Sequence, residues 1–140
     1  MTDFSVRGAN VVVVGAARSG VGAAQLLVAR GARVTLTEQR NKVSLDVRKL
    51  TEVGVELELG GHRTDTLAGA DLIVLSPGVP PVQPTLNAAR ERGVPIISEI
   101  ELASRWVRGR IVAITGTKGK STTTVLLGRM LEMAGCVAFV

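Results

Sequence analysis

The sequence has few aromatic residues, one cysteine and no long apolar run. Its aromatic side chains are Phe4, Trp106 and Phe139, too few for the stacking surface of a typical single-strand nucleic-acid binder. The single cysteine, Cys136, excludes a disulfide framework and favours a reducing cytoplasm. Apolar runs fall short of the ~18 residues that a membrane span needs, and the first residues do not resemble a secretory signal. We therefore expect a cytoplasmic protein with no nucleic-acid and no membrane partner.

Basic residues are concentrated near the C-terminal end. The 140 residues carry a net charge of +5, yet residues 1–101 hold 11 basic and 11 acidic side chains. Residues 102–140 hold 6 basic side chains and 1 acidic side chain. This asymmetry favours an anionic ligand at one end of the chain. A solvated face whose acidic counterpart lies elsewhere is the alternative.

Short β-branched runs alternate with helical stretches, and 46% of the residues are apolar, which is ample for a packed core. We expect strands at 11–14, 33–37, 55–59, 71–75, 94–97 and 111–115, and helices at 21–30, 44–53, 84–92, 98–106 and 120–133. This alternation predicts an α/β fold with a Rossmann-like parallel sheet that has helices on both faces. A further strand is expected to start at Val137.

Two strand–glycine loop–helix units, 11–30 and 111–134, could each present backbone N–H groups to an anion. The first unit begins a domain that we assign to residues 1–107. The second begins another domain at 108–140, and about 30 residues are too few to bury a core alone. We therefore expect the chain to stop inside its second domain.

The first glycine loop approximates a dinucleotide-binding turn. Gly15 would permit a tight turn out of the strand, and Gly20 would allow close packing of the following helix. Ala17 stands where a second glycine is usual, which weakens the interpretation as a nicotinamide or flavin site. Glu38, at the end of the second strand, is well placed to accept hydrogen bonds from ribose hydroxyls. Nucleotide binding and simple strand–helix packing both remain open for this turn.

The second glycine loop, Gly116–Thr122, has the chemistry of a phosphate loop. Its glycines let backbone N–H groups converge on phosphate oxygens, Lys120 supplies a positive charge, and the Ser121 hydroxyl can ligate Mg²⁺. Lys118 adds a second charge. The general pattern has glycine where this chain has Ile114, so the loop is a shortened variant.

Other conspicuous residues have ordinary structural interpretations. His62, beside two glycines, is expected in a surface loop, Cys136 as a small core residue, and Trp106 in helix packing. On spacing alone, the segment 76–78 (Ser-Pro-Gly) is expected to be a turn at the carboxyl edge of the sheet.

The motifs together resemble the Mur ligase family, which builds the peptide stem of bacterial peptidoglycan. The loop Gly116–Thr122 after Val-Ala-Ile-Thr is similar to the ATP loop of that family, which usually has Asn at the Lys118 position. Gly15–Gly20, Ser76–Val79 and Ser98–Leu102 are similar to the branch that adds D-glutamate to UDP-N-acetylmuramoyl-L-alanine. The resemblance covers essentially the whole chain.

This resemblance implies an ATP- and Mg²⁺-dependent ligase that works through an acyl phosphate and is monomeric at full length. The implied UDP-sugar residues are Arg18, Ser19, Glu38, Gln39, Arg40, Ser76 and Gly78. The implied ATP residues are Gly116, Thr117, Lys118, Gly119, Lys120, Ser121 and Thr122. Lys120 would stabilise the transferring γ-phosphoryl group and Ser121 would help to hold Mg²⁺. Glu38 stands where the family usually has aspartate.

The family continues for roughly three times this length, judged from ordinary domain sizes. A Gly-Gly-Asn segment and the D-glutamate-binding domain would follow, so we expect the 140 residues alone to be inactive. The alternatives are a nicotinamide-binding redox or sensor domain, another Mur-type ligase, a small phosphate-loop NTPase or kinase, and a non-enzymatic fragment that binds a partner surface.

Overall fold

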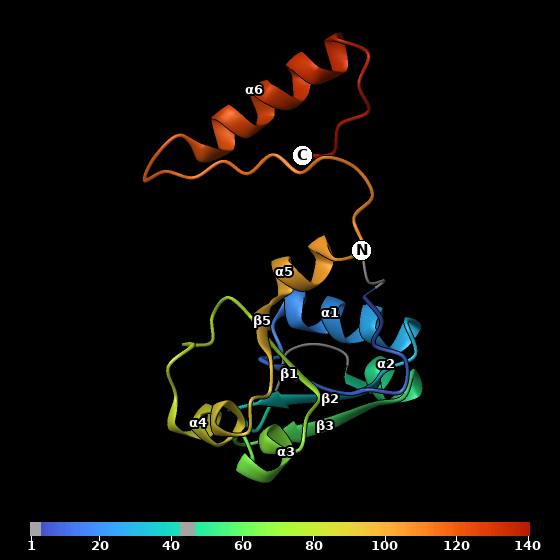
Figure 1. Ribbon diagram of the computed structural model, residues 1–140, viewed down its shortest axis with the longest axis vertical. Coiled ribbons are helices and arrows are strands. Elements are labelled where there is room, and N and C mark those ends of the chain that lie inside the picture. The colour runs from blue at the N-terminus through green and yellow to red at the C-terminus, as the bar shows by residue number, and fades with distance from the viewer. Residues whose placement is uncertain (1–3, 43–46) are drawn as a thin grey trace. The chain divides into compact units, whose positions relative to one another are not determined.

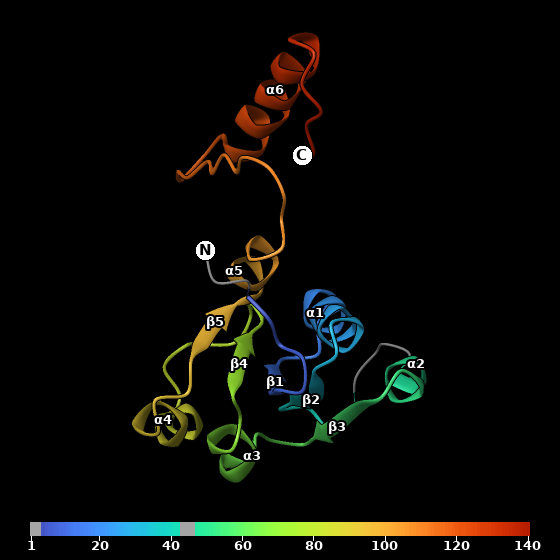
Figure 2. The ribbon, with the colours of Figure 1, turned by 45° about the vertical axis from the view of Figure 1, so that its right-hand side comes forward.

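The computed structural model describes residues 4–42 and 47–140, and the chain divides into two compact units, Met1–Val107 and Arg108–Val140. The elements of the first unit, shown in Figures 1 and 2, are β1 (Asn10–Val14), α1 (Arg18–Ala29), β2 (Arg33–Glu38), α2 (Val47–Glu52), β3 (Val55–Leu59), α3 (Thr64–Ala68), β4 (Leu72–Leu75), α4 (Pro84–Glu91), β5 (Ile96–Ser98) and α5 (Glu99–Ser104). The second unit contains α6 (Lys120–Met133).

The five strands of the first unit form one parallel sheet in the order β3-β2-β1-β4-β5. Figure 2 shows them side by side in this order. Strand β1 is central, and its Val12 lies opposite Thr35 of β2 and Ile73 of β4. The chain adds β2 and β3 on one side of β1 and then crosses to add β4 and β5 on the other. In such sheets a ligand crevice opens beside this reversal, at the carboxyl ends of the strands.

The apolar run of β1 is buried on both faces of the sheet. Val11 and Val13 pack into one apolar cluster, while Val12 and Val14 pack into another, and each is at most 3% exposed. Helices α1, α2 and α5 cover the first face through Leu27, Leu50 and Leu102, and α3 and α4 cover the second through Leu67 and Leu86. Because side chains alternate along a strand, a continuous valine run supplies both layers. The predicted α/β fold is therefore confirmed.

Several element boundaries differ from the sequence expectation. Helix α1 begins at Arg18 instead of residue 21, because Ala17 already has the extended backbone of an N-cap. Strand β5 starts at Ile96 instead of residue 94, and the preceding Pro95 still contributes its carbonyl to the Ile73 N–H. Of the expected helix 44–53, Val47–Glu52 is helical and residues 44–46 lie outside the described residues.

Helix α5 begins at the expected cap and ends early. The Ser98 side chain accepts a hydrogen bond from the Glu101 N–H at 3.1 Å, which satisfies one free N–H of the first turn. The helix ends at Ser104, two residues before the expected end. Trp106 then packs against Phe4, with the ring centroids 5.2 Å apart, and ties the end of the unit to its beginning.

Helix α3 was not predicted. It has five residues, Thr64–Ala68, and so few residues cannot show a helical period. Its buried Leu67 and Ala68 nevertheless belong to the core, so the segment between β3 and β4 is a packed crossover.

The second unit contains α6 as expected, but the predicted strand 111–115 is wrong. Ile111 and Val112 are 61% and 63% exposed. A strand requires a neighbour for its N–H and C=O groups, and none of the described residues pairs with this segment. The expectations for the last residues are also wrong, because Cys136 is exposed and no strand starts at Val137.

None of the helices in the described part of the chain combines the length and the apolar character that crossing a bilayer would require.

Candidate functional site

A cleft of about 490 Å³ opens at the carboxyl edge of the sheet. It is lined by Gly15, Ala17, Glu38, Gln39, Arg40, His62, Ser76, Gly78, Val79, Pro80 and Gln83. Five of the predicted UDP-sugar residues are in this lining, namely Glu38, Gln39, Arg40, Ser76 and Gly78. The other two, Arg18 and Ser19, are exposed in the first turn of α1 and are not part of the lining.

The glycine turn joins β1 to α1 under close steric restraint. Gly15 has φ +102°, and a Cβ there would lie 2.9 Å from both the Cβ of Ser76 and the Cγ2 of Val79. A Cβ on Gly20 would clash with the Gly15 carbonyl and lie 2.6 Å from Ser76 Oγ. The turn therefore lies directly against the start of the segment 76–78. It leaves the first N–H groups of the twelve-residue helix α1 without intrahelical partners, where an anion is favoured.

Glu38 ends β2 and its carboxylate accepts four hydrogen bonds. Oε2 accepts from the Ala16 N–H at 2.9 Å and from Arg40 Nη2 at 3.2 Å. Oε1 accepts from the Arg40 N–H at 3.2 Å and from Arg40 Nε at 3.1 Å. The Arg40 side chain, helped by the backbone donors, outweighs burial and lowers the pKa of Glu38 to about 2. The carboxylate is therefore ionised at neutral pH, and its acceptor positions are used within the protein.

Arg40 is the exposed partner of this pair. Its side chain is 66% exposed, whereas that of Glu38 is 9% exposed. Glu38 raises the pKa of Arg40 through the same hydrogen bond. The guanidinium has five N–H groups, and two of its nitrogens are held by Glu38, so it retains donors for a ligand oxygen.

His62 lies after β3 and lines the cleft, which the sequence interpretation as a surface-loop residue missed. Its Nδ1 is 2.9 Å from the Thr37 hydroxyl, which is also 3.1 Å from the carbonyl oxygen of Gly61. Burial lowers the pKa of His62, partly opposed by the negative charges of Glu38 and Glu58. The signal that could have found this residue is its place directly after a parallel strand.

Ser76 lies at the end of β4 and is 3% exposed. Its hydroxyl is 3.0 Å from the Gly15 carbonyl oxygen and 2.6 Å from Glu99 Oε1. Glu99, in the first turn of α5, was not predicted as a neighbour of the site. The Ser76 side chain therefore links the first glycine turn to α5, and it bonds inward.

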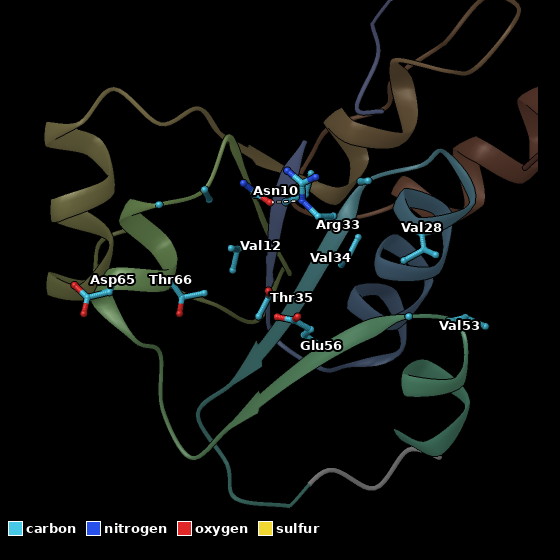
Figure 3. Close-up of a pocket in the computed structure, with 15 residues that line it drawn as sticks. Asn10, Val12, Val28, Arg33, Val34, Thr35, Val53, Glu56, Asp65 and Thr66 are labelled. Atoms are coloured by element: carbon cyan, nitrogen blue, oxygen red, sulfur yellow. Dashed lines mark hydrogen bonds between the residues drawn. The ribbon is translucent and has the colours of Figure 1, made fainter. Parts of the chain in front are cut away.

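A second cavity, of about 530 Å³, lies at the opposite edge of the sheet (Figure 3). Its lining is largely apolar and also includes the polar residues Asn10, Arg33 and Asp65. Arg33 Nε donates to Asn10 Oδ1 at 2.7 Å, so these two groups satisfy one another. Because ligands of parallel sheets bind at the carboxyl ends of the strands, the cleft beside Glu38 is the candidate site.

The predicted phosphate loop, Gly116–Thr122, lies in the second unit and folds back on the side chain of Lys120. Gly119 has φ +77° and is the N-cap of α6. Lys120 Nζ donates to the Gly116 carbonyl oxygen at 2.6 Å across the loop. Ser121 and Thr122 are exposed in the first turn of this fourteen-residue helix. The segment Gly116–Thr122 thus forms one loop with a lysine, hydroxyl groups and a free helix N-terminus.

This donor set suits a nucleotide-bound magnesium ion. A hydroxyl such as that of Ser121 is a hard oxygen ligand of the kind that Mg²⁺ accepts together with phosphate oxygens. Among the described residues, no cluster of three or more His, Cys, Asp or Glu side chains could hold a metal by itself.

Sheet order, glycine turn and carboxyl-edge cleft together define a Rossmann-like α/β protein. Residues 9–98, more than half of the chain, match the family described as Mur ligase MurD-like, N-terminal domain. The chain belongs to this MurD-like family of Mur ligases. The family resemblance inferred from the sequence is therefore confirmed.

Curated relatives match nearly the whole chain. The UDP-N-acetylmuramoylalanine–D-glutamate ligase of Desulfatibacillum aliphaticivorans is 46% identical over 139 residues, which are 98% of this chain and 31% of the relative. The protein of the same name from Anaeromyxobacter dehalogenans is 50% identical over 133 residues, 94% of this chain and 29% of the relative. The chain therefore spans about a third of the length of the curated relatives that it matches.

Solved structures share the fold. A murein peptide ligase from Psychrobacter arcticus superposes with a TM-score of 0.64 at 25% identity, covering 91% of this chain and 27% of that one. A pseudomurein peptide ligase type C from Methanothermus fervidus has a TM-score of 0.61 at 28% identity, with the same coverage of both chains. A murein peptide ligase and a pseudomurein peptide ligase are thus among the structural neighbours of this chain.

Proposed function

We propose that this chain is the N-terminal part of an ATP-dependent ligase that adds D-glutamate to UDP-N-acetylmuramoyl-L-alanine in peptidoglycan biosynthesis. The observation that carries the proposal is the 46% identity to a D-glutamate ligase across 98% of the chain. That match runs through both the carboxyl-edge cleft and the phosphate loop. A relative of the same activity would need both sites.

In this proposal the cleft holds the UDP-sugar. Arg18 and Ser19, in the first turn of α1, would bind the diphosphate through their N–H groups and side chains. Arg40 and Gln39 would contact the uridine end, and Gly78 would lie against the diphosphate-sugar side. Glu38 would act through Arg40, because its carboxylate accepts bonds from Arg40 and Ala16. Ser76 would likewise act indirectly, because its hydroxyl is hydrogen-bonded to the Gly15 carbonyl oxygen of the glycine turn.

The loop Gly116–Thr122 is proposed as the ATP site. Thr117, Lys118 and Gly119 would wrap the phosphates, and Lys120 would exchange the Gly116 carbonyl for phosphate oxygens. Ser121 would hold Mg²⁺, which when bound would neutralise charge on the transferring phosphoryl group. In the proposed reaction ATP phosphorylates the alanine carboxylate. The D-glutamate amine then displaces phosphate and forms the amide bond.

A nicotinamide-binding domain is the main alternative, and the geometry of Glu38 disfavours it. A dinucleotide site uses an acidic residue here to accept hydrogen bonds from the ribose hydroxyls. The two oxygens of Glu38 already accept four bonds within the protein. A ribose would have to displace Arg40 or the Ala16 N–H.

The setting that we propose is the cytoplasm, with a monomeric full-length enzyme. The single cysteine supports a reducing compartment. The proposed partners are UDP-N-acetylmuramoyl-L-alanine, ATP and, in the full-length protein, D-glutamate.

The direct test is calorimetric titration of this 140-residue chain with UDP-N-acetylmuramoyl-L-alanine and, separately, with NADH. We expect binding of the UDP-sugar and at least tenfold weaker binding of NADH, a difference of about 1.4 kcal/mol. Tighter binding of NADH would refute the proposal. We also expect no ligation of D-glutamate by this chain alone, so an ATP-dependent rate from it would refute its assignment as a part of the enzyme.

A further inference from the structure

The hydrogen bonds around Thr37 determine which nitrogen of His62 carries the proton. The Thr37 hydroxyl is 3.1 Å from the Gly61 carbonyl oxygen, which can only accept, so both contacts of the hydroxyl are hydrogen bonds when its one proton goes to Gly61. The contact of 2.9 Å between Thr37 Oγ1 and His62 Nδ1 then needs a proton on Nδ1. Thr37 is fully buried, so water does not compete for its hydroxyl.

The other ring nitrogen, Nε2, is consequently a hydrogen-bond acceptor when the ring is neutral. Burial lowers the pKa of His62, so the neutral form prevails at pH 7. The charged groups around the ring are Glu38 on β2, Glu58 on β3, and the exposed Arg40 and Arg63. Among the described residues Nε2 has no hydrogen-bond partner, and His62 lines the cleft.

The cleft otherwise offers few acceptors for a ligand N–H or O–H group. Both oxygens of Glu38 accept two bonds each from within the protein. The Ser76 hydroxyl bonds inward, and Arg40 only donates. Apart from His62, the side chains of the lining that can accept are the exposed amide of Gln39 and that of Gln83, whose nitrogen donates to Pro80.

From this arrangement we infer that His62 Nε2 accepts a hydrogen bond from an N–H or O–H group on the nucleoside half of the bound UDP-sugar. His62 is thus a specificity-determining residue for the uridine end. The inference rests on the proposed function, because it needs a uridine nucleotide in this cleft. The donor is either the imide N–H of the base or a ribose hydroxyl. Analogues of UDP that each lack one of these groups distinguish the two, because only the analogue without the donor binds more weakly.

The test compares UDP with analogues that lack one donor each, by calorimetric titration of the 140-residue chain at pH 7.5. The probes are 3-methyluridine diphosphate, 2′-deoxy-UDP and 3′-deoxy-UDP. With the unsubstituted chain, we expect one analogue to bind about threefold to tenfold more weakly than UDP, the usual effect of one hydrogen bond. In His62→Phe, which keeps a ring and removes both nitrogens, UDP and that analogue should bind within about twofold of one another.

Controls separate recognition from support of the fold. His62→Leu is a second variant without ring nitrogens, so a folding defect of His62→Phe does not block the test, and thermal melting identifies the folded variant. Arg63→Ala, which removes an exposed neighbouring side chain, should leave the ratio between UDP and the analogue unchanged. If a His62 variant lowers the affinity for UDP and for all analogues by the same factor, the inference is overturned and His62 has a structural role.

The titrations distinguish a failure of the proposed function from a failure of the inference about His62. If UDP binds the unsubstituted chain and the His62 variants keep its discrimination, only the inference about His62 is wrong. If UDP does not bind at all, the proposed function fails and the inference about His62 fails with it. An unsubstituted chain that binds UDP and every analogue equally would also overturn the inference.

Discussion

At the scale of single residues, the candidate site is organised by charge. Glu38 is nearly buried, yet it stays ionised because Arg40 and two backbone N–H groups surround its carboxylate. The Glu38 carboxylate therefore holds the Arg40 guanidinium in place instead of binding a ligand itself. Arg40, with its remaining donors, is the part of the pair that faces solvent.

Glu38→Gln should make this pair visible in the pH dependence of stability. The folded-state pKa of Glu38, about 2, lies below its ordinary value of 4.5. Ionised Glu38 therefore stabilises the fold above about pH 4.5, and this contribution is lost as the pH falls towards 2. We expect the variant to be less stable at pH 7 by roughly 2 kcal/mol, a value that allows for solvent screening of the exposed arginine.

Urea denaturation at pH 7 and pH 3 measures the effect, and the difference between the two proteins should shrink at the lower pH. Glu91→Gln, at the exposed end of α4, is the matched control and should change the stability much less. An equal loss for Glu38→Gln at both pH values would contradict a stabilising charge.

The sequence predicted the positions of these residues better than their partners. It identified Glu38 because a parallel strand ends there, and the family resemblance added Arg40. It assigned the carboxylate to a ligand, because the bonds to Ala16 and Arg40 depend on side-chain geometry that spacing does not encode. His62 was missed because a lone histidine beside glycines has no pattern of its own. The role proposed for it rests on the contact with Thr37, which lies 25 residues earlier.

At the scale of elements, the close approach of β1, α1 and the segment 76–78 shapes the site. Gly20 belongs to α1, but its missing side chain leaves room for the Gly15 carbonyl and for Ser76. The helix can therefore begin directly after the strand. The packing observed at this turn and the binding proposed for it depend on the same geometry.

Gly20→Ala should destabilise the first unit by about 1–3 kcal/mol, because the added methyl group would meet backbone that cannot move freely. Gly22→Ala is a matched control on the same helix, where a Cβ meets nothing within 4 Å. It should stabilise the protein by up to about 1 kcal/mol through helix propensity. Urea denaturation of both variants provides the measurement, and two effects of the same sign and size would contradict the packing argument.

The five strands of the sheet were predicted from their apolar and β-branched runs, whereas the expected strand 111–115 is absent from the structure. The continuous valine run of β1 and the helix α6, which lies between a glycine loop and Gly135, were both predicted from the sequence. The segment 111–115 has the apolar character of a strand, but none of the described residues pairs with it. Strand formation depends on a neighbour, and a sequence pattern reports only one side of that pair.

At the scale of the whole molecule, the two glycine loops, Gly15–Gly20 and Gly116–Thr122, lie in two separate units of the chain. The cleft belongs to Met1–Val107 and the phosphate loop to Arg108–Val140. The first unit has a two-sided apolar core. We therefore expect binding of the UDP-sugar and binding of ATP to be separable by substitution.

Lys120→Ala should weaken ATP binding by at least tenfold, because it removes the charge that the loop directs inward. It should leave the affinity for UDP unchanged, since the cleft is built from residues of the other unit. Lys118→Asn, which introduces the residue usual in the resembling family, is the control and should keep ATP binding within about threefold. Calorimetry with each nucleotide measures both effects, and a loss of UDP affinity in Lys120→Ala would contradict the separation.

The link from Gly15 through Ser76 to Glu99 has a consequence for how the protein is made. These groups are 61 and 23 residues apart along the chain. A ribosome adds residues in order, so the turn after β1 exists long before the serine and the glutamate that hold it. Contacts of such separation form late in folding, after the cost of closing long loops has been met. A nascent chain that has not yet reached Glu99 therefore lacks the hydrogen bond that joins Ser76 to α5, although it already contains every residue that lines the cleft.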